Sequence, residues 1–140
     1  MKRIYSFNKE TGAATVEIIS GDLDFVGMAY CHDDDMDFMS EKTGLQIAEV
    51  RAEIDFLRHI RDNELIPAIK TLQHLQDTMK TSKHYNKDSY EATMLRRQIA
   101  IKKNELMAVK EEIARSRQFL TAYIHGKEEL YTKLRKVKNS

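Results

Sequence analysis

A heptad stripe of apolar residues runs without interruption through the last third of the chain. Fourteen positions follow one another at alternating spacings of three and four residues, and eleven of the fourteen are apolar. These positions are Ala92, Leu95, Ile99, Lys102, Leu106, Val109, Ile113, Ser116, Leu120, Tyr123, Lys127, Leu130, Leu134 and Val137. Only an α-helix places residues at these spacings on one side, and a partner helix is what buries such a stripe along its whole length. The stripe therefore predicts a long helix that packs along a second helix.

Short β-branched and aromatic runs, separated by turn signals, occupy residues 1–31. The clearest runs are residues 15–19 and 25–31, and residues 8–12 and 21–22 have the composition of turns. This spacing predicts three strands in an antiparallel meander. Because a sheet of about 30 residues buries too little surface to be stable alone, we expect it to lie against helices or to pair with another subunit.

An acidic connector, residues 32–43, is expected to lead into a first helix. Thr43 and Gln46 have the spacing of a capping box, in which the hydroxyl accepts a hydrogen bond from a free amide of the first turn. The expected apolar positions of this helix are Ile47, Val50, Ile54, Leu57, Leu65, Ala68, Leu72, Leu75 and Met79. The step from Leu57 to Leu65 predicts a local break in register, and Pro67 predicts a kink or a division of the helix.

A polar bend, residues 81–88, is expected to join two antiparallel helices. Asp88 and Glu91 have the spacing of a second capping box. Gly126 either ends the second helix or lies within it, since a helical Gly costs only about 1 kcal/mol.

The predicted fold class is α+β and mostly α. A small N-terminal antiparallel β-sheet precedes a long antiparallel helical hairpin that resembles a coiled coil. Residues 1–43 would hold the sheet and the acidic connector, and residues 44–140 the hairpin, together as a single domain. Ala100, Met107 and Ala114 widen the apolar stripe beyond what one neighbouring helix covers, which predicts a homo-oligomer.

The charge balance narrows the classes of function. The chain has 23 Lys and Arg against 22 Asp and Glu, a formal net charge of +1. This balance argues against binding to a membrane or to a nucleic-acid polymer, since both favour a strong positive excess. The sequence has no apolar run of about 20 residues and no segment typical of a signal peptide. Together with the single cysteine, Cys31, this makes a cytoplasmic location the simplest expectation.

The acidic connector contains the pattern closest to a metal site. Asp33, Asp35 and Asp37 have the spacing of the first three ligands of a calcium loop, but the positions that require Gly and Glu hold Phe38 and Gly44. A solvated acidic loop is therefore expected, with a two-carboxylate magnesium site as the alternative.

The remaining Cys and His residues form no catalytic or metal-binding pattern. Neighbours on a strand point to opposite faces, so Cys31 and His32 are not expected to act as nucleophile and base. His59 and His74 are too far apart for helical metal ligands. The sequence thus predicts no catalytic residue, no metal ligand and no cofactor.

Positive charge and aromatic rings gather at the bend and at the start of the second helix. The candidate ligand-binding residues here are His84, Tyr85, Asn86, Tyr90, Arg96 and Arg97, with Lys83 and Lys87 beside them. Aromatic faces stack on nucleobases, and the fork of an Arg matches phosphate oxygens. The set is therefore typical of a site for a small phosphorylated nucleotide. A hydrophilic bend with ordinary surface arginines is the simpler alternative.

A second basic set consists of Arg51, Arg58 and Arg61 on the first helix and Arg115 and Arg117 on the second. Of these, Arg58, Arg115 and Arg117 are candidate ligand-binding residues. In a hairpin that turns near residue 84, Arg51 would lie level with Arg117, and two arginines on facing helices could hold a phosphate. The alternative is that these arginines form ion pairs with glutamates of the facing helix.

Residues 27–52 carry a family resemblance. A strand ends in Cys31-His32, an acidic loop follows, and Thr43-Gly44 opens a helix with an Ile-Ala-x-x-Arg-Ala run. With its layout of a small sheet before two long antiparallel helices, the chain is similar to the Thoeris anti-defence proteins of the first type. The resemblance implies a phage protein that binds cyclic ADP-ribose isomers, and in some members cyclic oligonucleotides, without cleaving them. It also implies assembly as hexamers of dimers.

The function expected from these observations is capture of a cyclic nucleotide signal by a non-enzymatic homo-oligomer, in the cytoplasm of the host cell if the protein is phage-encoded. Arg or Lys would neutralise the phosphates, Tyr85 or Tyr90 would stack on adenine, and His84 or Asn86 would read its edge. The first alternative is a coiled-coil module that inhibits or scaffolds another protein. The second alternative is a phosphodiesterase-like enzyme that uses the acidic loop at residues 33–37.

Overall fold

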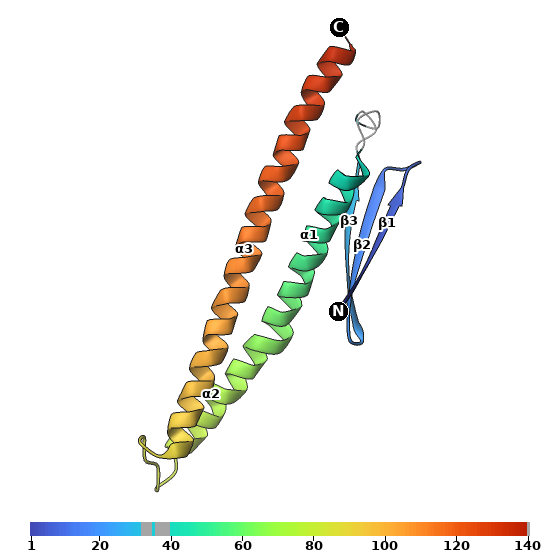
Figure 1. Cartoon of the computed structure of the whole chain (residues 1–140). Helices are drawn as coiled ribbons and strands as arrows, with labels where there is room; N and C mark the ends of the chain where they lie inside the picture. Colours follow the sequence, from blue (N-terminus) through green and yellow to red (C-terminus); the bar gives the residue numbers. More distant parts are fainter. Residues whose placement is uncertain (32–34, 36–39, 140) are drawn as a thin grey trace. The chain divides into compact units, whose positions relative to one another are not determined.

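The computed structural model describes residues 1–31, 35 and 40–139. Along the chain the elements are β1 (Lys2–Asn8), β2 (Ala13–Ser20), β3 (Leu23–Tyr30), α1 (Glu41–His59), η2 (Ile60–Leu65), α2 (Ile66–Lys80) and α3 (Tyr90–Lys138) (Figure 1). The fold is thus α+β and mostly helical, with a small N-terminal sheet and a long C-terminal helix, as predicted.

The chain divides into two compact units. Unit 1 comprises Met1–Phe56 and Ala114–Ser140, and unit 2 comprises Leu57–Ile113. Both boundaries lie inside helices, so each unit contains part of α1 and part of α3.

The sheet of unit 1 is an antiparallel meander with the strand order β1-β2-β3. Tyr5 of β1 pairs with Val16 of β2, which pairs in turn with Gly27 of β3. In the first turn, the side-chain oxygen of Asn8 accepts hydrogen bonds from the amides of Glu10 and Thr11, at 2.9 and 3.3 Å. The predicted meander and the positions of its two turns are therefore confirmed.

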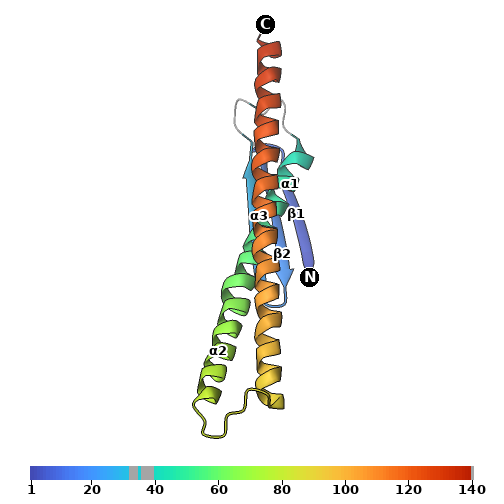
Figure 2. The same ribbon diagram turned by 90° about the vertical axis from the view of Figure 1, so that its left-hand side faces the viewer.

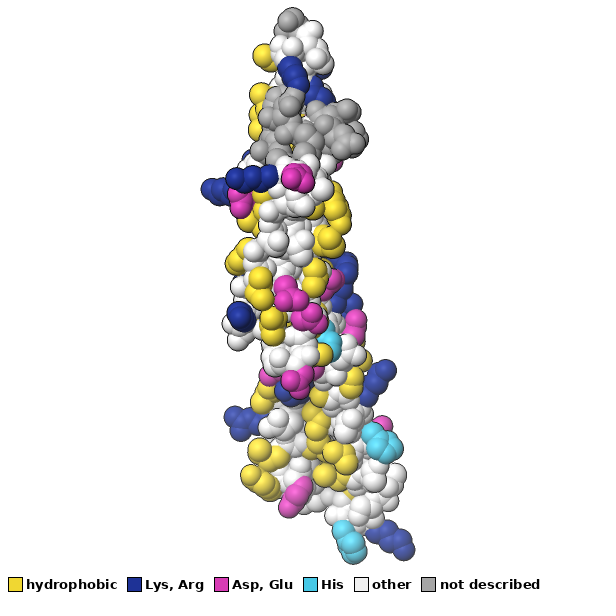
Figure 3. Space-filling view, turned by 90° about the vertical axis from the view of Figure 1, so that its right-hand side faces the viewer, with side chains coloured by type: hydrophobic (Ala, Val, Ile, Leu, Met, Phe, Trp, Pro, Cys, Tyr) yellow, Lys and Arg dark blue, Asp and Glu magenta, His cyan; other side chains and the backbone are white. Residues whose placement is uncertain are grey.

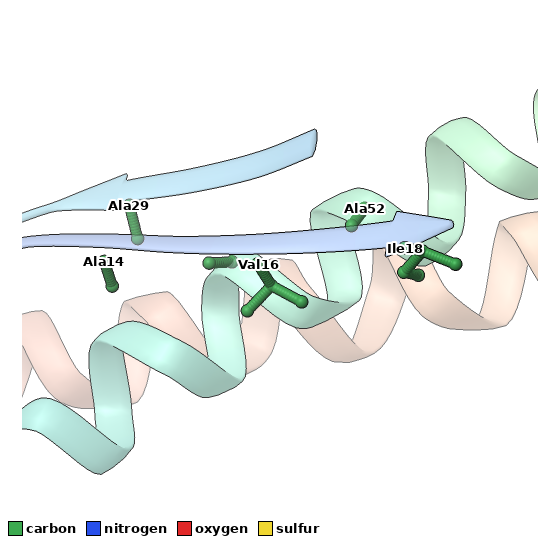
Figure 4. Packing of buried hydrophobic residues seen from close by; sticks show 6 residues of the cluster. Ala14, Val16, Ile18, Ala29 and Ala52 are labelled. Carbon is green, nitrogen blue, oxygen red and sulfur yellow. The ribbon is translucent and has the colours of Figure 1, made fainter. Parts of the chain in front are cut away.

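One face of the sheet packs on α1 and forms the core of unit 1. Ala14, Val16 and Ile18 of β2 are completely buried, as are Ala48 and Ala52 of α1. Figure 4 shows the β2 side chains pointing toward the helix that carries Ala52. Because the α1 side chains at this contact are only methyl groups, the helix lies close to the sheet.

Polar contacts fix α1 at the edges of the sheet. Arg3 of β1 donates to Glu53 at 2.6 Å and lies 3.3 Å from Glu49. The hydroxyl of Tyr5 donates to Glu49 as well. At the other edge, Arg51 donates to the backbone carbonyl of Met28 in β3 at 2.6 Å.

The other face of the sheet carries a mixture of apolar and charged side chains. Ile4, Glu17 and Val26 form one row across the three strands, and Ile4 and Val26 are 41% and 43% exposed. In Figure 3, which looks at this side, hydrophobic side chains lie among acidic and basic ones.

The start of α1 corrects the predicted capping box. The helix begins at Glu41, and the amide of Thr43 donates to the hydroxyl oxygen of Ser40 at 3.2 Å. Ser40 is therefore the N-cap, and Thr43 lies inside the helix with its side chain buried. The expected cap at Thr43 was wrong because Ser40 offers the same hydroxyl three residues earlier.

In unit 2, the predicted break in register is a π-helical segment. η2 occupies Ile60–Leu65, between the apolar positions Leu57 and Leu65. A π-turn accommodates an extra residue per turn, which accounts for the eight-residue step. Pro67 follows in the first turn of α2, so the predicted division of the first helix falls at this π-helical segment.

The apolar face of α2 differs by one position from the predicted one. Leu65 and Ile69 are buried, whereas Leu75, which was expected to face inward, is 51% exposed. The prediction was wrong at Leu75, whereas Ala68, Leu72 and Met79 of the predicted set are half-buried. In Figures 1 and 2, α2 runs beside the first half of α3 in unit 2.

The start of α3 corrects the second capping box. The amide of Ala92 donates to the hydroxyl oxygen of Ser89 at 3.2 Å, so Ser89, not Asp88, caps this helix. α3 then continues for 49 residues through Gly126, which selects the uninterrupted helix of the two expected possibilities. Within the part of the chain that the structure describes, no helix is long and apolar enough to cross a membrane.

The buried residues of α3 confirm the heptad stripe over most of its length. Ala92, Ile99 and Ile113 are buried, and all three belong to the stripe. Toward the C-terminus, Leu130 and Val137 are 44% and 72% exposed. An α-helix drifts by about 20° per heptad, so the later stripe positions turn outward.

Candidate functional site

The bend between α2 and α3 in unit 2 is built by local hydrogen bonds. The amide of Tyr85 donates to the carbonyl of Ser82 at 3.2 Å, and the amide of Ser89 donates to the carbonyl of Asn86 at 3.0 Å. The side-chain oxygen of Asn86 accepts a hydrogen bond from the amide of Asp88 at 2.9 Å. Both the backbone carbonyl and the side-chain oxygen of Asn86 thus stabilise the turn. The side-chain NH₂ of Asn86 is the group that could contact a ligand.

The candidate rings at the bend are accessible to different degrees. Tyr85 is half-buried, His84 is exposed, and Tyr90, the first residue of α3, is 73% exposed. Arg96 and Arg97 are also exposed, and Arg96 donates to the hydroxyl of Thr93 at 3.3 Å. Seven residues span almost two helical turns, so Tyr90 and Arg97 share one side of α3, about 10 Å apart along its axis. Arg96 points away from that side by about 100°.

The electrostatics of this region favour an anion. Between residues 80 and 103 there are seven Lys and Arg but only two acidic residues, Asp88 and Glu91. The rest of the chain therefore carries the compensating negative charge. The bend is locally basic in a protein whose formal net charge is only +1.

The second set of arginines is divided between the two units. Arg58 is half-buried in unit 2, whereas Arg115 and Arg117 are exposed in unit 1. Since a residue turns by about 100° in an α-helix, Arg115 and Arg117 point to opposite sides of α3. They cannot hold one phosphate together. Arg51, the expected partner of Arg117, contacts the carbonyl of Met28 instead.

Of the acidic connector, the structure describes Asp35, and His32, Asp33 and Asp37 lie outside the described residues. Asp35 is only 8% exposed and forms an ion pair with Arg135 of α3. The expectation of a solvated loop was therefore wrong at Asp35, because a cation 100 residues away in the sequence compensates its burial. Within the described part of the chain, no three His, Cys, Asp or Glu side chains gather in a way that could hold a metal ion.

A pocket of about 150 Å³ lies beside this ion pair in unit 1. Its described lining comes from the β1–β2 turn, the end of β3, the start of α1, and α3. The lining residues are Gly12, Ala29, Tyr30, Cys31, Asp35, Ser40, Thr43, Gly44, Ile47, Ile124, Lys127, Glu128 and Tyr131. None of the residues predicted from the sequence to bind a ligand lines the pocket.

The polar lining of the pocket includes the hydroxyls of Thr43 and Tyr131 beside the charged side chains of Asp35, Lys127 and Glu128. Burial raises the pKa of the Tyr131 hydroxyl above its ordinary value; the charges of Cys31 and Asp35 raise it further, and a hydrogen bond from Thr43 opposes the shift. Tyr131 is therefore a neutral donor and acceptor at physiological pH. Thr43 is buried as well.

An aromatic and cationic ridge of α3 leads to the pocket. Phe119 and Tyr123 stack with their ring centroids 5.6 Å apart, and the ammonium of Lys127 lies 5.4 Å from the centroid of Tyr123. Tyr131 and Arg135 continue the same four-residue spacing. This spacing of rings and cations is the sequence signal that could have revealed the pocket, since residues four apart are neighbours on a helix surface.

Comparison of the chain with protein-family models, with curated proteins and with solved structures found no match.

Proposed function

We propose that the protein is a non-enzymatic binding protein that sequesters a small phosphorylated nucleotide. The observation that carries the proposal is the combination of exposed rings and unbalanced positive charge at the bend of unit 2. Tyr90 offers an open aromatic face, and Arg97 lies on the same side of α3. The similarity of residues 27–52 to the Thoeris anti-defence proteins supports cyclic ADP-ribose isomers as the ligand, with cyclic oligonucleotides as a further possibility within the same class.

In the proposed complex, each group at the bend has a separate task. The ring of Tyr90 or Tyr85 stacks on the base, and Arg96 or Arg97 neutralises a phosphate. The side-chain NH₂ of Asn86 or the ring of His84 meets the edge of the base. Arg58, Arg115 and Arg117 remain a second candidate set for the phosphates, acting singly.

Sequestration requires slow release, which an open surface does not provide. We therefore include self-association in the proposal, with a second copy that covers the bound nucleotide. Ile101 and Met107, which are 41% and 61% exposed on α3 of unit 2, offer apolar surface for such a contact. A buried ligand then exchanges more slowly because water and competing ions are excluded.

One capture experiment tests the proposed function. The protein is incubated with a cyclic ADP-ribose isomer, separated from free ligand, and denatured, and the supernatant is chromatographed. Recovery of intact ligand in proportion to protein supports sequestration. Recovery of an altered nucleotide would mean catalysis, and absence of depletion before denaturation would contradict nucleotide capture.

The exposed side chains of Ile101 and Met107 also favour a second candidate function. A helix with apolar side chains on its surface can bind a partner helix, as coiled-coil inhibitors and scaffolds do. If this candidate is correct, Met107→Lys abolishes association with the partner protein. Neither the native protein nor the variant then captures a nucleotide.

A further inference from the structure

We infer that the pocket of unit 1 binds a neutral heteroaromatic ring of nucleobase size, inserted between β3, α1 and α3, with any anionic substituent of the ligand held at Lys127. This site is separate from the bend: the pocket belongs to unit 1 and the bend to unit 2. The inference therefore goes beyond the proposed function, although both concern ligands that contain a base.

The size of the pocket limits the ligand to about one ring system. Its volume of about 150 Å³ equals the share of about five water molecules in the liquid. Pockets for drug-sized molecules begin at about 300 Å³. A complete nucleotide does not fit inside, but its base does.

The walls of the pocket suit a flat ring with a polar edge. Ala29, Ile47 and Ile124 provide apolar contact for the ring faces. The hydroxyls of Thr43 and Tyr131 lie in the same lining, and Thr43 donates a hydrogen bond to Tyr131. Each hydroxyl oxygen has two lone pairs and can accept a further hydrogen bond. Nucleobases present amino and ring N–H donors on one edge, and these donors would meet the hydroxyl oxygens.

The charges around the pocket favour a neutral ring. The buried carboxylate of Asp35 is already compensated by Arg135, so the interior offers no uncompensated charge to a charged ring. Lys127 contacts the Tyr123 ring, and no described carboxylate pairs with its ammonium. Glu128 also lines the pocket but is exposed, so water screens its repulsion of an anion. A phosphate attached to the base would thus meet Lys127.

The experiment uses the full chain with adenosine and adenosine monophosphate as probes, measured by saturation-transfer difference NMR and by titration calorimetry. We expect both probes to bind and Ile124→Trp, which fills the pocket, to abolish binding of both. Thr43→Val with Tyr131→Phe should weaken both at least tenfold. Lys127→Gln should weaken the monophosphate several-fold and leave adenosine unchanged, whereas Lys133→Gln, an exposed cation on the same helix, should change neither.

Three results would overturn the inference: no binding of adenosine at millimolar concentration, full binding by Ile124→Trp, or full binding by the variant without the two hydroxyls. Circular dichroism melting shows whether Ile124→Trp folds. If it does not fold, the nearly isosteric double variant with Thr43→Val and Tyr131→Phe tests the inference instead. Binding that is lost in the pocket variants and kept in Tyr85→Ala with Tyr90→Ala supports the pocket and contradicts the bend as the site of this probe. The reverse pattern overturns the pocket and leaves the proposed function intact.

Discussion

Gly27 of β3 and Ala48 of α1 lie in direct backbone contact: a Cβ atom built on Gly27 would be 1.9 Å from the carbonyl oxygen of Ala48. The same Cβ would be 2.5 Å from the amide nitrogen of Ala52. No side chain separates the sheet from the helix at this point. The position of α1 on the sheet therefore depends on a glycine at residue 27 and on small side chains at residues 48 and 52.

The first prediction follows from this contact. In Gly27→Ala, the added methyl group meets backbone atoms that cannot move aside as a flexible side chain would, so α1 must shift away from β3. We expect the free energy of unfolding to fall by about 1–3 kcal/mol, the usual cost of overpacking a core, or by more. Urea denaturation followed by circular dichroism measures the change. A variant as stable as the native protein would mean that the helix does not lie on Gly27.

Gly126→Ala provides the matched control and is a prediction of the opposite sign. Gly126 lies inside α3, and a Cβ atom built on it meets no atom within 4 Å other than its chain neighbours and the adjoining helix backbone. Replacement of a helical glycine by alanine reduces the conformational entropy of the unfolded chain, so we expect stabilisation by about 0.5–1 kcal/mol. Loss of stability, measured by the same denaturation experiment, would indicate that α3 is not helical at Gly126.

Much of the fold could be predicted because it depends on periodic signals. The β-branched runs predicted the meander, the heptad predicted the buried side of α3, and the step from Leu57 to Leu65 predicted the break that η2 fills. The contact of Ala48 and Ala52 with the sheet was missed because small apolar residues give a weak periodic signal. The two N-caps were placed wrongly because Ser, Thr and Asp compete for the same role within three residues.

The candidate pocket could not be predicted from the sequence. Its lining combines the turn at Gly12, the end of β3, the start of α1 and residues 124–131 of α3. Which of these segments meet is decided by tertiary packing, not by local pattern. The bend was found from the sequence because its rings and cations lie within about four helical turns of one another along the chain.

A third prediction concerns the ion pair of Asp35 and Arg135. Arg135→Gln removes the cation and leaves the carboxylate of Asp35, whose side chain is 12% exposed, without compensation. We expect this variant to lose about 1–3 kcal/mol of stability, the cost of an unsatisfied buried polar group. Asp35→Asn in the Arg135→Gln background should recover part of the loss, which a double-mutant cycle measures. Lys136→Gln, an exposed residue of the same helix, should be neutral; equal losses in both single variants would contradict the role of the pair.

A fourth prediction concerns alkaline pH. Burial raises the pKa of Tyr131, and a hydrogen bond to Glu49 raises that of Tyr5. In the unfolded chain both hydroxyls lose their protons near pH 10, before they do so in the folded protein. The stability that depends on these groups is therefore complete below about pH 10 and is lost as the pH rises through the folded pKa.

Tyr131→Phe removes the contribution of the Tyr131 hydroxyl to this loss of stability at alkaline pH. We expect the decline in the free energy of unfolding above pH 10 to be smaller in Tyr131→Phe than in the native protein. Tyrosinate absorbance in a pH titration should lack a late component in this variant. Tyr90→Phe, in which the ring is exposed, is the control, and it should reproduce the native decline; an unchanged decline in Tyr131→Phe would show that the hydroxyl is not protected.

The last prediction tests the bend as the nucleotide site. If a base stacks on Tyr90, Tyr90→Ala should weaken binding of a cyclic ADP-ribose isomer by about 1–3 kcal/mol, the usual contribution of one base–aromatic stack. If Tyr85 is the platform, Tyr85→Ala should show this loss instead. Arg97→Ala should weaken binding by a similar amount, through a lost charge-assisted hydrogen bond, and Arg97→Lys should restore only part of it because an ammonium lacks the planar fork. Arg96→Ala tests the neighbouring cation in the same way.

All of these residues are half-buried or exposed at the surface, so the variants should melt at the temperature of the native protein. Lys103→Ala, an exposed cation of the same helix, and Phe119→Ala, an exposed ring of α3, serve as controls for charge and for aromatic surface. Calorimetry decides the result. Full affinity in both the Tyr85/Tyr90 and the Arg96/Arg97 double variants would exclude the bend, because no ring and no arginine at this end of α3 would then contribute to the complex. Arg58, Arg115 and Arg117 would then be replaced one at a time, because they form the second candidate set for the phosphates.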